Sequence, residues 1–176
     1  MKFEISIFIK IKSLTKLVFG NYDTGNVNSM MEVFRDCSLL TSINLNHFDT
    51  SSVTNMFGMF YGCSSLNHLD VQGFDTSMVN NMSRLFYGCE KLNFLAVNVF
   101  DTNLVEDMSY MFYNCKIIDN LDVSGFKTGK VVSMKYMFYN CSSLTEIKVN
   151  NFRTPEVTDM SYMFYNCLKI QKLDLL

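Results

Sequence analysis

The sequence predicts an α/β fold: a right-handed solenoid of stacked repeats, with a parallel sheet on one face and short helices on the other. Three observations lead to this prediction. Six cysteines recur at a constant interval, an apolar pattern typical of strands recurs with them, and an apolar pattern typical of helices follows it in each repeat. Repeats of this kind bury the apolar face of each unit against its neighbours. Parallel strands joined by a crossover follow a right-handed path.

The cysteines stand at positions 37, 63, 89, 115, 141 and 167, and their constant spacing sets the length of the repeat. We divide the chain into an N-terminal strand or cap (1–11) and a repeat domain (12–176). In the N-terminal segment apolar residues alternate with others, and Glu4, Lys10 and Lys12 interrupt or follow them, which favours a strand over a secretory signal. The full repeats are 12–37, 38–63, 64–89, 90–115, 116–141 and 142–167, followed by a half repeat, 168–176.

The first half of each repeat contains the apolar pattern LxxLxL, with isoleucine, valine or phenylalanine at some of its positions. In the second repeat these residues are Leu40, Ile43 and Leu45. The pattern is the strand signature of leucine-rich repeats, in which each unit adds one short strand to a parallel sheet. It makes the predicted fold a leucine-rich-repeat solenoid.

The second half of each repeat has the spacing of one helix face, as in Val53, Met56, Met59, Phe60 and Cys63. A threonine stands before each such segment, where its hydroxyl would cap the helix, and a proline follows it in the sixth repeat. The residue before each cysteine is one that tolerates left-handed backbone, which predicts a helix C-cap. The threonines are Thr24, Thr50, Thr76, Thr102, Thr128 and Thr154, and the cap residues are Asp36, Gly62, Gly88, Asn114, Asn140 and Asn166.

The cysteine column has three interpretations. A free cysteine behaves as a small apolar side chain and is often buried, which favours packing between coils. Disulfides between neighbouring coils are an alternative, although side chains that point the same way form them poorly. Zinc binding is the third, but a row of thiols is not tetrahedral, and His47 and His68 fall in different columns of the repeat. No repeated base accompanies the cysteines, which argues against nucleophilic catalysis.

Charge and composition exclude several classes of function. The chain has 15 lysines and arginines against 17 acidic residues, a balance that favours neither nucleic acid nor an anionic membrane surface. No apolar run is long enough to cross a bilayer. The outward positions of the predicted strands form no acidic pair, triad or phosphate cradle. We therefore expect no enzyme activity, cofactor, metal, nucleic-acid partner or membrane insertion.

An aspartate column accompanies the first four threonines, and its two interpretations are a calcium ladder and turn hydrogen bonding. No glycine-rich loop surrounds these aspartates, and the fifth and sixth repeats carry Lys127 and Arg153 instead, which favours turns. The aspartates are Asp23, Asp49, Asp75 and Asp101.

Repeats such as SSLNHLDVQGFDTSMVNNMSRLFYGC (64–89) combine LxxLxV, then F-D-T, then an aromatic pair before the cysteine. From Lys12 to Leu176 the chain resembles the BspA-like leucine-rich repeats of bacterial surface proteins, a group first catalogued as a mycoplasma family of unknown function. The resemblance implies an adhesin-like protein, at the cell surface or secreted, that binds a protein or glycan. No signal peptide, lipobox or wall anchor is visible in the chain.

Two tyrosine columns supply the candidate interaction surface. At about 100° per residue, both columns lie on the predicted helix opposite its apolar side. They have two interpretations: tyrosines of neighbouring coils stack and cover the core, or the rings form a docking surface for a protein or a sugar. The tyrosines are Tyr61, Tyr87, Tyr110, Tyr113, Tyr136, Tyr139, Tyr162 and Tyr165.

We expect a non-enzymatic protein-interaction module. The alternative is a structural spacer, or a self-associating repeat segment with no ligand of its own. The sequence finishes on KLDLL, which has strand residues and no polar cap. Either the natural chain continues past this edge, or the edge pairs with a second copy, so a homodimer through the C-terminal sheet edge belongs to this alternative.

Overall fold

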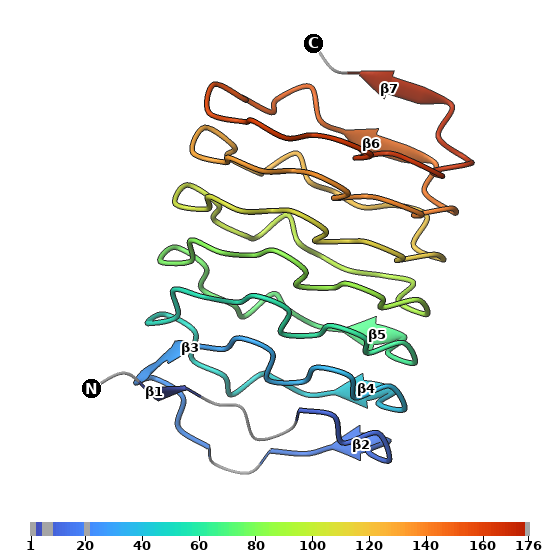
Figure 1. Ribbon diagram of the computed structural model, residues 1–176. Helices are drawn as coiled ribbons and strands as arrows, with labels where there is room; N and C mark the ends of the chain where they lie inside the picture. Colours follow the sequence, from blue (N-terminus) through green and yellow to red (C-terminus); the bar gives the residue numbers. More distant parts are fainter. Residues whose placement is uncertain (1–2, 5–8, 20–21, 175–176) are drawn as a thin grey trace.

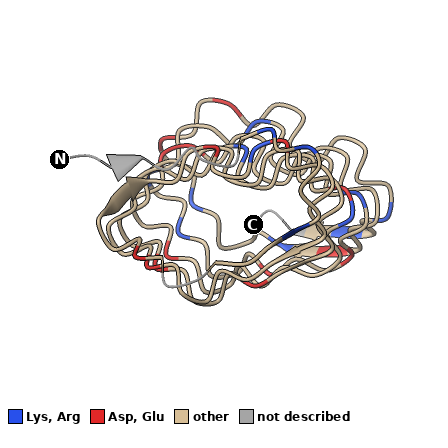
Figure 2. Ribbon diagram, turned by 90° about the horizontal axis from the view of Figure 1, so that it is seen from below, with Lys and Arg blue, Asp and Glu red and all other residues tan. Residues whose placement is uncertain are grey.

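The computed structural model describes residues 3–4, 9–19 and 22–174 and shows a stack of similar coils (Figure 1). The N-terminal residues lie at one end of the stack and the C-terminal residues at the other. Seen along the stack, the coils superimpose as a flattened oval outline (Figure 2). Equivalent residues of consecutive repeats pair with one another, since Lys16 pairs with Ser42 and Ser42 with His68.

The LxxLxL segments form short strands that pair in parallel, as predicted. The strands β2-β4-β5 form one sheet and β6-β7 another, and isolated bridges at Phe94 and Asn120 extend them by one coil each. The strand β1 lies in the predicted N-terminal strand and pairs with β3, while residues 5–8 lie outside the described part. The strands are β1 (Phe3–Glu4), β2 (Lys16–Leu17), β3 (Val27–Ser29), β4 (Ser42–Ile43), β5 (His68–Leu69), β6 (Glu146–Lys148) and β7 (Lys172–Asp174).

A second line of parallel pairing runs through the segments that follow each threonine. It begins at β3 and continues one residue per coil, through Ser29 and Asn55 to Asp159. Asn55, Asn81, Asp107 and Asp159 each accept the backbone N–H two residues later through a side-chain oxygen. The coils are therefore joined along two lines, and not by a sheet on one face alone.

The predicted helices are wrong, and with them the α/β class. The described residues contain short strands, bridges and turns but no helix. In each coil two residues have left-handed backbone, one four positions after the other. In the second coil they are Gly58 and Gly62, with φ of 56° and 71°. Left-handed residues interrupt a right-handed helix, so each segment becomes a run of tight turns.

Hydrogen bonding in these turns alternates between the coil itself and its neighbour. The N–H groups of Met59, Tyr61 and Cys63 donate to carbonyls three positions earlier in the same coil. Those of Met56, Gly58, Phe60 and Gly62 donate to Asn81, Ser83, Leu85 and Tyr87 of the next coil. An α-helix would instead direct these donors to its own carbonyls one turn back.

The spacing of the coils explains why turns replace helices. Helices pack with their axes about 8 to 10 Å apart, whereas paired strands lie about 4.8 Å apart. Stacked rings on the face where helices were predicted are separated by only 4.4 Å between Tyr61 and Tyr87, and by 4.5 Å between Tyr87 and Tyr113. That face therefore keeps strand spacing, which leaves no room for helices.

The predicted inward side chains are nevertheless buried. Val53, Met56, Met59, Phe60 and Cys63 are fully enclosed, although no helix carries them. Their equivalents form continuous rows through the core, the clearest being a phenylalanine row with ring centroids 5.3 to 5.8 Å apart. Its members are Phe34, Phe60, Phe86, Phe112, Phe138 and Phe164.

The threonines link coils and do not cap helices, so their predicted role is wrong. The hydroxyl of Thr50 donates to the carbonyl of Asp75 at 2.8 Å, and Thr76 donates to Asp101 in the same way at 2.9 Å. Both side chains are buried. The predicted left-handed residues before the cysteines are confirmed as left-handed, with φ of 57° to 72°, but they belong to turns.

Candidate functional site

The structure brings the eight candidate tyrosines together in two parallel rows. In the first tyrosine ladder, successive rings lie 4.4 to 5.0 Å apart and within 12° of parallel. In the second, the spacings are 4.9 and 5.0 Å. The first ladder consists of Tyr61, Tyr87, Tyr113, Tyr139 and Tyr165, and the second of Tyr110, Tyr136 and Tyr162.

The two ladders contact each other along their length. Tyr110 and Tyr113 lie 5.9 Å apart between ring centroids, and Tyr136 and Tyr139 lie 5.4 Å apart. The interplanar angles of 50° place the edge of one ladder against the other. Aromatic pairs of this geometry add about 0.5 to 1.5 kcal/mol each beyond their buried area.

The backbone under the second ladder is left-handed, as it is at the equivalent Glu32, Gly58 and Arg84 of the first three coils. Tyr110, Tyr136 and Tyr162 have φ of 59°, 55° and 57°. A bulky residue rarely adopts this conformation, and it costs about 1 to 2 kcal/mol relative to the right-handed form. Gly58 occupies the same position in the second coil at a φ of 56°, where it has no Cβ to strain. The tyrosines therefore hold their place against a local conformational preference.

An arginine continues each ladder by one coil toward the N-terminus. The Arg35 guanidinium lies 4.7 Å from the ring centroid of Tyr61, and that of Arg84 lies 5.1 Å from Tyr110. The Lys135 amine also approaches Tyr110, at 5.9 Å. These cations were not predicted as site residues. The signal that finds them is the repeat itself, because each arginine stands exactly one repeat before a tyrosine of its column.

Three tyrosines of the ladders, Tyr87, Tyr136 and Tyr139, have raised pKa values. Burial, followed by charge repulsion from Tyr61 and Tyr113, raises the pKa of Tyr87 to about 12. Burial and neighbouring tyrosines also raise the pKa of Tyr136 and Tyr139. Each phenol can therefore both donate and accept a hydrogen bond.

Stacking determines which part of each ring is available to a ligand. Tyr87, Tyr113, Tyr139 and Tyr136 each have a parallel ring on both faces. Their outer surface consequently consists of ring edges and hydroxyls. Tyr165 is 55% exposed, the inner rings less so.

The cysteines belong to the hydrophobic core and not to the tyrosine ladders. All six are free thiols, and Cys37, Cys63, Cys89, Cys115 and Cys141 are buried. Burial raises the pKa of Cys115 to about 12 and that of Cys89 well above its usual value. Five thiols lie within 3.0 to 3.3 Å of a phenylalanine carbonyl of the preceding coil, which ties the column to its neighbours. A thiol that stays protonated is a poor nucleophile and a poor metal ligand.

The aspartate column forms turns. Asp49 accepts hydrogen bonds from the N–H and hydroxyl of Ser51, and these bonds hold the pKa of its carboxyl below the usual value. Asp75 and Asp101 bond the residue two positions on in the same way. Among residues 3–4, 9–19 and 22–174, no group of three acidic, histidine or cysteine side chains is arranged to hold a metal ion. In that part of the chain no helix is long and apolar enough to cross a membrane.

Comparison with known proteins identifies the family. A family model described as a Mycoplasma protein of unknown function, DUF285, matches residues 5–95 and again residues 90–174. No curated protein and no solved structure matches the chain. The two matched segments overlap at residues 90–95 and together span residues 5–174. The chain therefore belongs to the mycoplasma family of unknown function DUF285.

Proposed function

We propose that the protein belongs to the BspA-like surface proteins and acts as a non-enzymatic, adhesin-like interaction module. Its docking surface is formed by the two tyrosine ladders, and its ligand is a protein at a cell surface. The location at the cell surface, or outside the cell, rests on the resemblance of the repeats to those of bacterial surface proteins.

The observation that carries this proposal is the stacking of the tyrosines into two rows that contact each other. The neighbouring rings hold each tyrosine in place, so that the surface offers a fixed row of ring edges and hydroxyls. A rigid row of amphipathic rings is a surface suited to protein recognition.

The geometry of the ladders favours a protein over a sugar as the partner. Sugar rings stack on the faces of aromatic rings, and the inner tyrosines have both faces covered by their neighbours. What remains is a row of phenolic hydroxyls flanked by Arg84, and by Arg35 and Lys135, which already contact Glu32 and Asp159. Hydroxyls and cations of this kind pair with the carbonyls and carboxylates of a protein surface.

A triple variant tests the proposal: Tyr110→Gly, Tyr136→Gly and Tyr162→Gly together. Glycine is the residue that the second coil carries at this position, so the backbone conformation is kept. We expect binding to intact cells to fall at least about tenfold, the effect of removing residues that contribute most of the binding energy of an interface. The melting temperature should change little. The control is Phe94→Ser, which removes an exposed aromatic side chain from outside the ladders.

Enzymatic treatment of the target cells identifies the class of partner. Binding that is lost after protease treatment and kept after glycosidase treatment supports a protein ligand. Unchanged binding by the triple variant, together with a large drop in melting temperature, would assign the ladders a purely structural role. Fractionation of cells with an antibody to the repeats tests the proposed location.

The alternative function is a structural spacer that self-associates. In the described part of the chain, β7 pairs with β6 on one side only, and a strand with an unpaired side can pair with a second copy. Sedimentation of the protein and of Lys172→Pro tests this. A dimer that the proline weakens would support it, and a monomer at high concentration would contradict it.

A further inference from the structure

A basic pocket lies between the fifth and sixth coils, at the position where the first four coils carry aspartate. Its volume is about 510 Å³, within the range of pockets that hold small ligands. Lys127, Lys130 and Arg153 line it, and no carboxylate does. It shares no lining residue with the tyrosine ladders.

The cations of this pocket have no acidic partner. No ion pair among the described residues involves Lys127, Lys130 or Arg153. Elsewhere, by contrast, Lys116 and Lys135 contact Glu90 and Asp159. Like charges gathered without a counter-charge repel one another, and an anion placed among them removes that repulsion.

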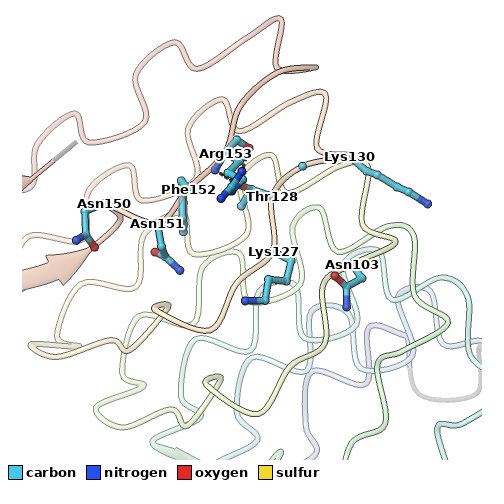
Figure 3. A pocket seen from close by; sticks show the side chains of 9 residues that line it. Asn103, Lys127, Thr128, Lys130, Asn150, Asn151, Phe152 and Arg153 are labelled. Carbon is cyan, nitrogen blue, oxygen red and sulfur yellow. Dashed lines mark hydrogen bonds between the residues drawn. The ribbon is translucent and has the colours of Figure 1, made fainter. Parts of the chain in front are cut away.

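The fold holds the pocket in a defined shape. The N–H groups of Lys127 and Arg153 each donate to the threonine hydroxyl of the preceding coil at 2.7 Å, which anchors both residues at their backbone. Figure 3 shows Lys127 and Asn151 extending into the same space between the coils, with Arg153 close to Phe152, whereas Lys130 extends away from the other side chains. Lys127 and Arg153 line the pocket from neighbouring coils, and the side chain of Lys130 extends away from the other side chains.

The other residues that line the pocket indicate what kind of molecule would carry the anionic group. Asn150 presents an amide group, which donates to and accepts from hydroxyls. The amide nitrogens of Asn103 and Asn151 already donate to Asp101 and to the Ser124 carbonyl. Phe152 is half-buried and supplies an apolar wall. A ring with hydroxyls on its edges and apolar hydrogens on its faces can hydrogen-bond to the asparagines and pack against Phe152.

We propose that this pocket binds a sugar that carries an anionic sulfate or phosphate group. Lys127 and Arg153 contact the anionic group, and the asparagines contact the hydroxyls of the ring. The site is independent of the tyrosine ladders, so the triple tyrosine variant binds the charged sugar as the unmodified protein does. Failure of one proposal is in this way distinguishable from failure of the other.

Titration calorimetry tests the site with three probes: a sulfated heparin disaccharide, glucose 6-phosphate, and an uncharged disaccharide. We expect saturable binding of at least one charged sugar and weaker binding at higher salt, because salt screens exposed charges. Tighter binding of the sulfated or of the phosphorylated probe identifies the source of the ligand. Equal affinity for the uncharged disaccharide, or no saturable binding of either charged sugar, would overturn the proposal.

The variants are Lys127→Asp, Arg153→Gln and, as control, Lys91→Gln. Lys127→Asp reproduces the Asp-Thr-Gly sequence of the first coil, where the Gly25 N–H donates to Asp23 at 2.9 Å, so the local fold accepts it. We expect Lys127→Asp and Arg153→Gln each to weaken binding about tenfold or more, as the loss of a charged hydrogen bond does. Lys91 is exposed and lies outside the pocket, so an equal loss in Lys91→Gln would show non-specific attraction and refute the site.

Discussion

Replacing Gly58 by alanine is expected to destabilise the protein by about 1 to 2 kcal/mol, the cost of left-handed backbone for a residue with a Cβ. Gly58 has a φ of 56°. The added methyl group itself has room, since its carbon would lie 3.4 Å from Glu32 Cγ and 3.5 Å from Tyr61 Cβ. The loss of stability therefore comes from the backbone conformation and not from a clash.

The sign of this change distinguishes a turn from the helix that the sequence predicts. In a helix interior, alanine in place of glycine stabilises by about 0.8 to 1.0 kcal/mol. The two structures thus predict free energies of unfolding that differ by about 2 to 3 kcal/mol for the same variant. A difference of this size is well above the uncertainty of equilibrium unfolding.

The assay is urea unfolding at neutral pH, followed by circular dichroism and by tyrosine fluorescence. Gly73→Ala is the matched control, because Gly73 is not among the residues with positive φ and an added Cβ there meets nothing within 4 Å. That variant should be neutral or more stable by about 0.4 to 1 kcal/mol. At Tyr136, which also has left-handed backbone, the Tyr136→Gly variant should be more stable than the Tyr136→Ala variant. A Gly58→Ala protein more stable than the unmodified one would refute the turn structure.

Three further predictions concern the core, the thiols and the tyrosines. Phe112→Ala should cost about 3 to 5 kcal/mol, because Phe112 is fully buried between two stacked rings, and a loss under about 1 kcal/mol would place it at the surface. The buried cysteines should react slowly with a thiol reagent until denaturant is added; rapid labelling of the native protein, or a mass loss matching disulfides, would contradict their packing role. Because the pKa of Tyr87 is raised from 10.0 to about 12 in the folded protein, the folded state holds this proton more tightly than the unfolded chain. Stability should then fall as pH rises from about 10 to about 12, and Tyr87→Phe should reduce that fall; an identical alkaline profile in both proteins would contradict it.

Much of the arrangement of side chains could be predicted from the repeat. The LxxLxL columns form parallel pairs in which each residue meets its equivalent in the next repeat, as β2 and β4 show. The helical spacing of Val53, Met56 and Met59 correctly predicted that these side chains are buried. In a chain that turns regularly around a core, equivalent residues of every repeat face that core. The left-handed residues before the cysteines were also predicted, since glycine and asparagine tolerate that conformation.

The sequence predicted that the eight tyrosines share one face, and the structure brings them together for a different reason. The predicted helix placed Tyr110 and Tyr113 on one face, and the turns bring them together within 5.9 Å. Stacking between neighbouring coils was one of the two interpretations of the tyrosine columns, and the parallel rings confirm it. Arg35 and Arg84 were missed, although each stands one repeat before a tyrosine of its column, and the stacked coils bring each guanidinium over that ring.

The period, the columns that face the core and the residues that share a surface all follow from the repeat pattern, because a strict repeat places equivalent residues in equivalent environments. The tertiary structure alone decided between helix and turn. Local spacing is the same for both, and the choice depends on whether backbone N–H groups bond within a coil or across to the next. Coils joined at strand spacing on two sides leave no room for a helix, so Gly58 and its equivalents adopt left-handed backbone and the N–H groups of alternate residues cross to the neighbouring coil.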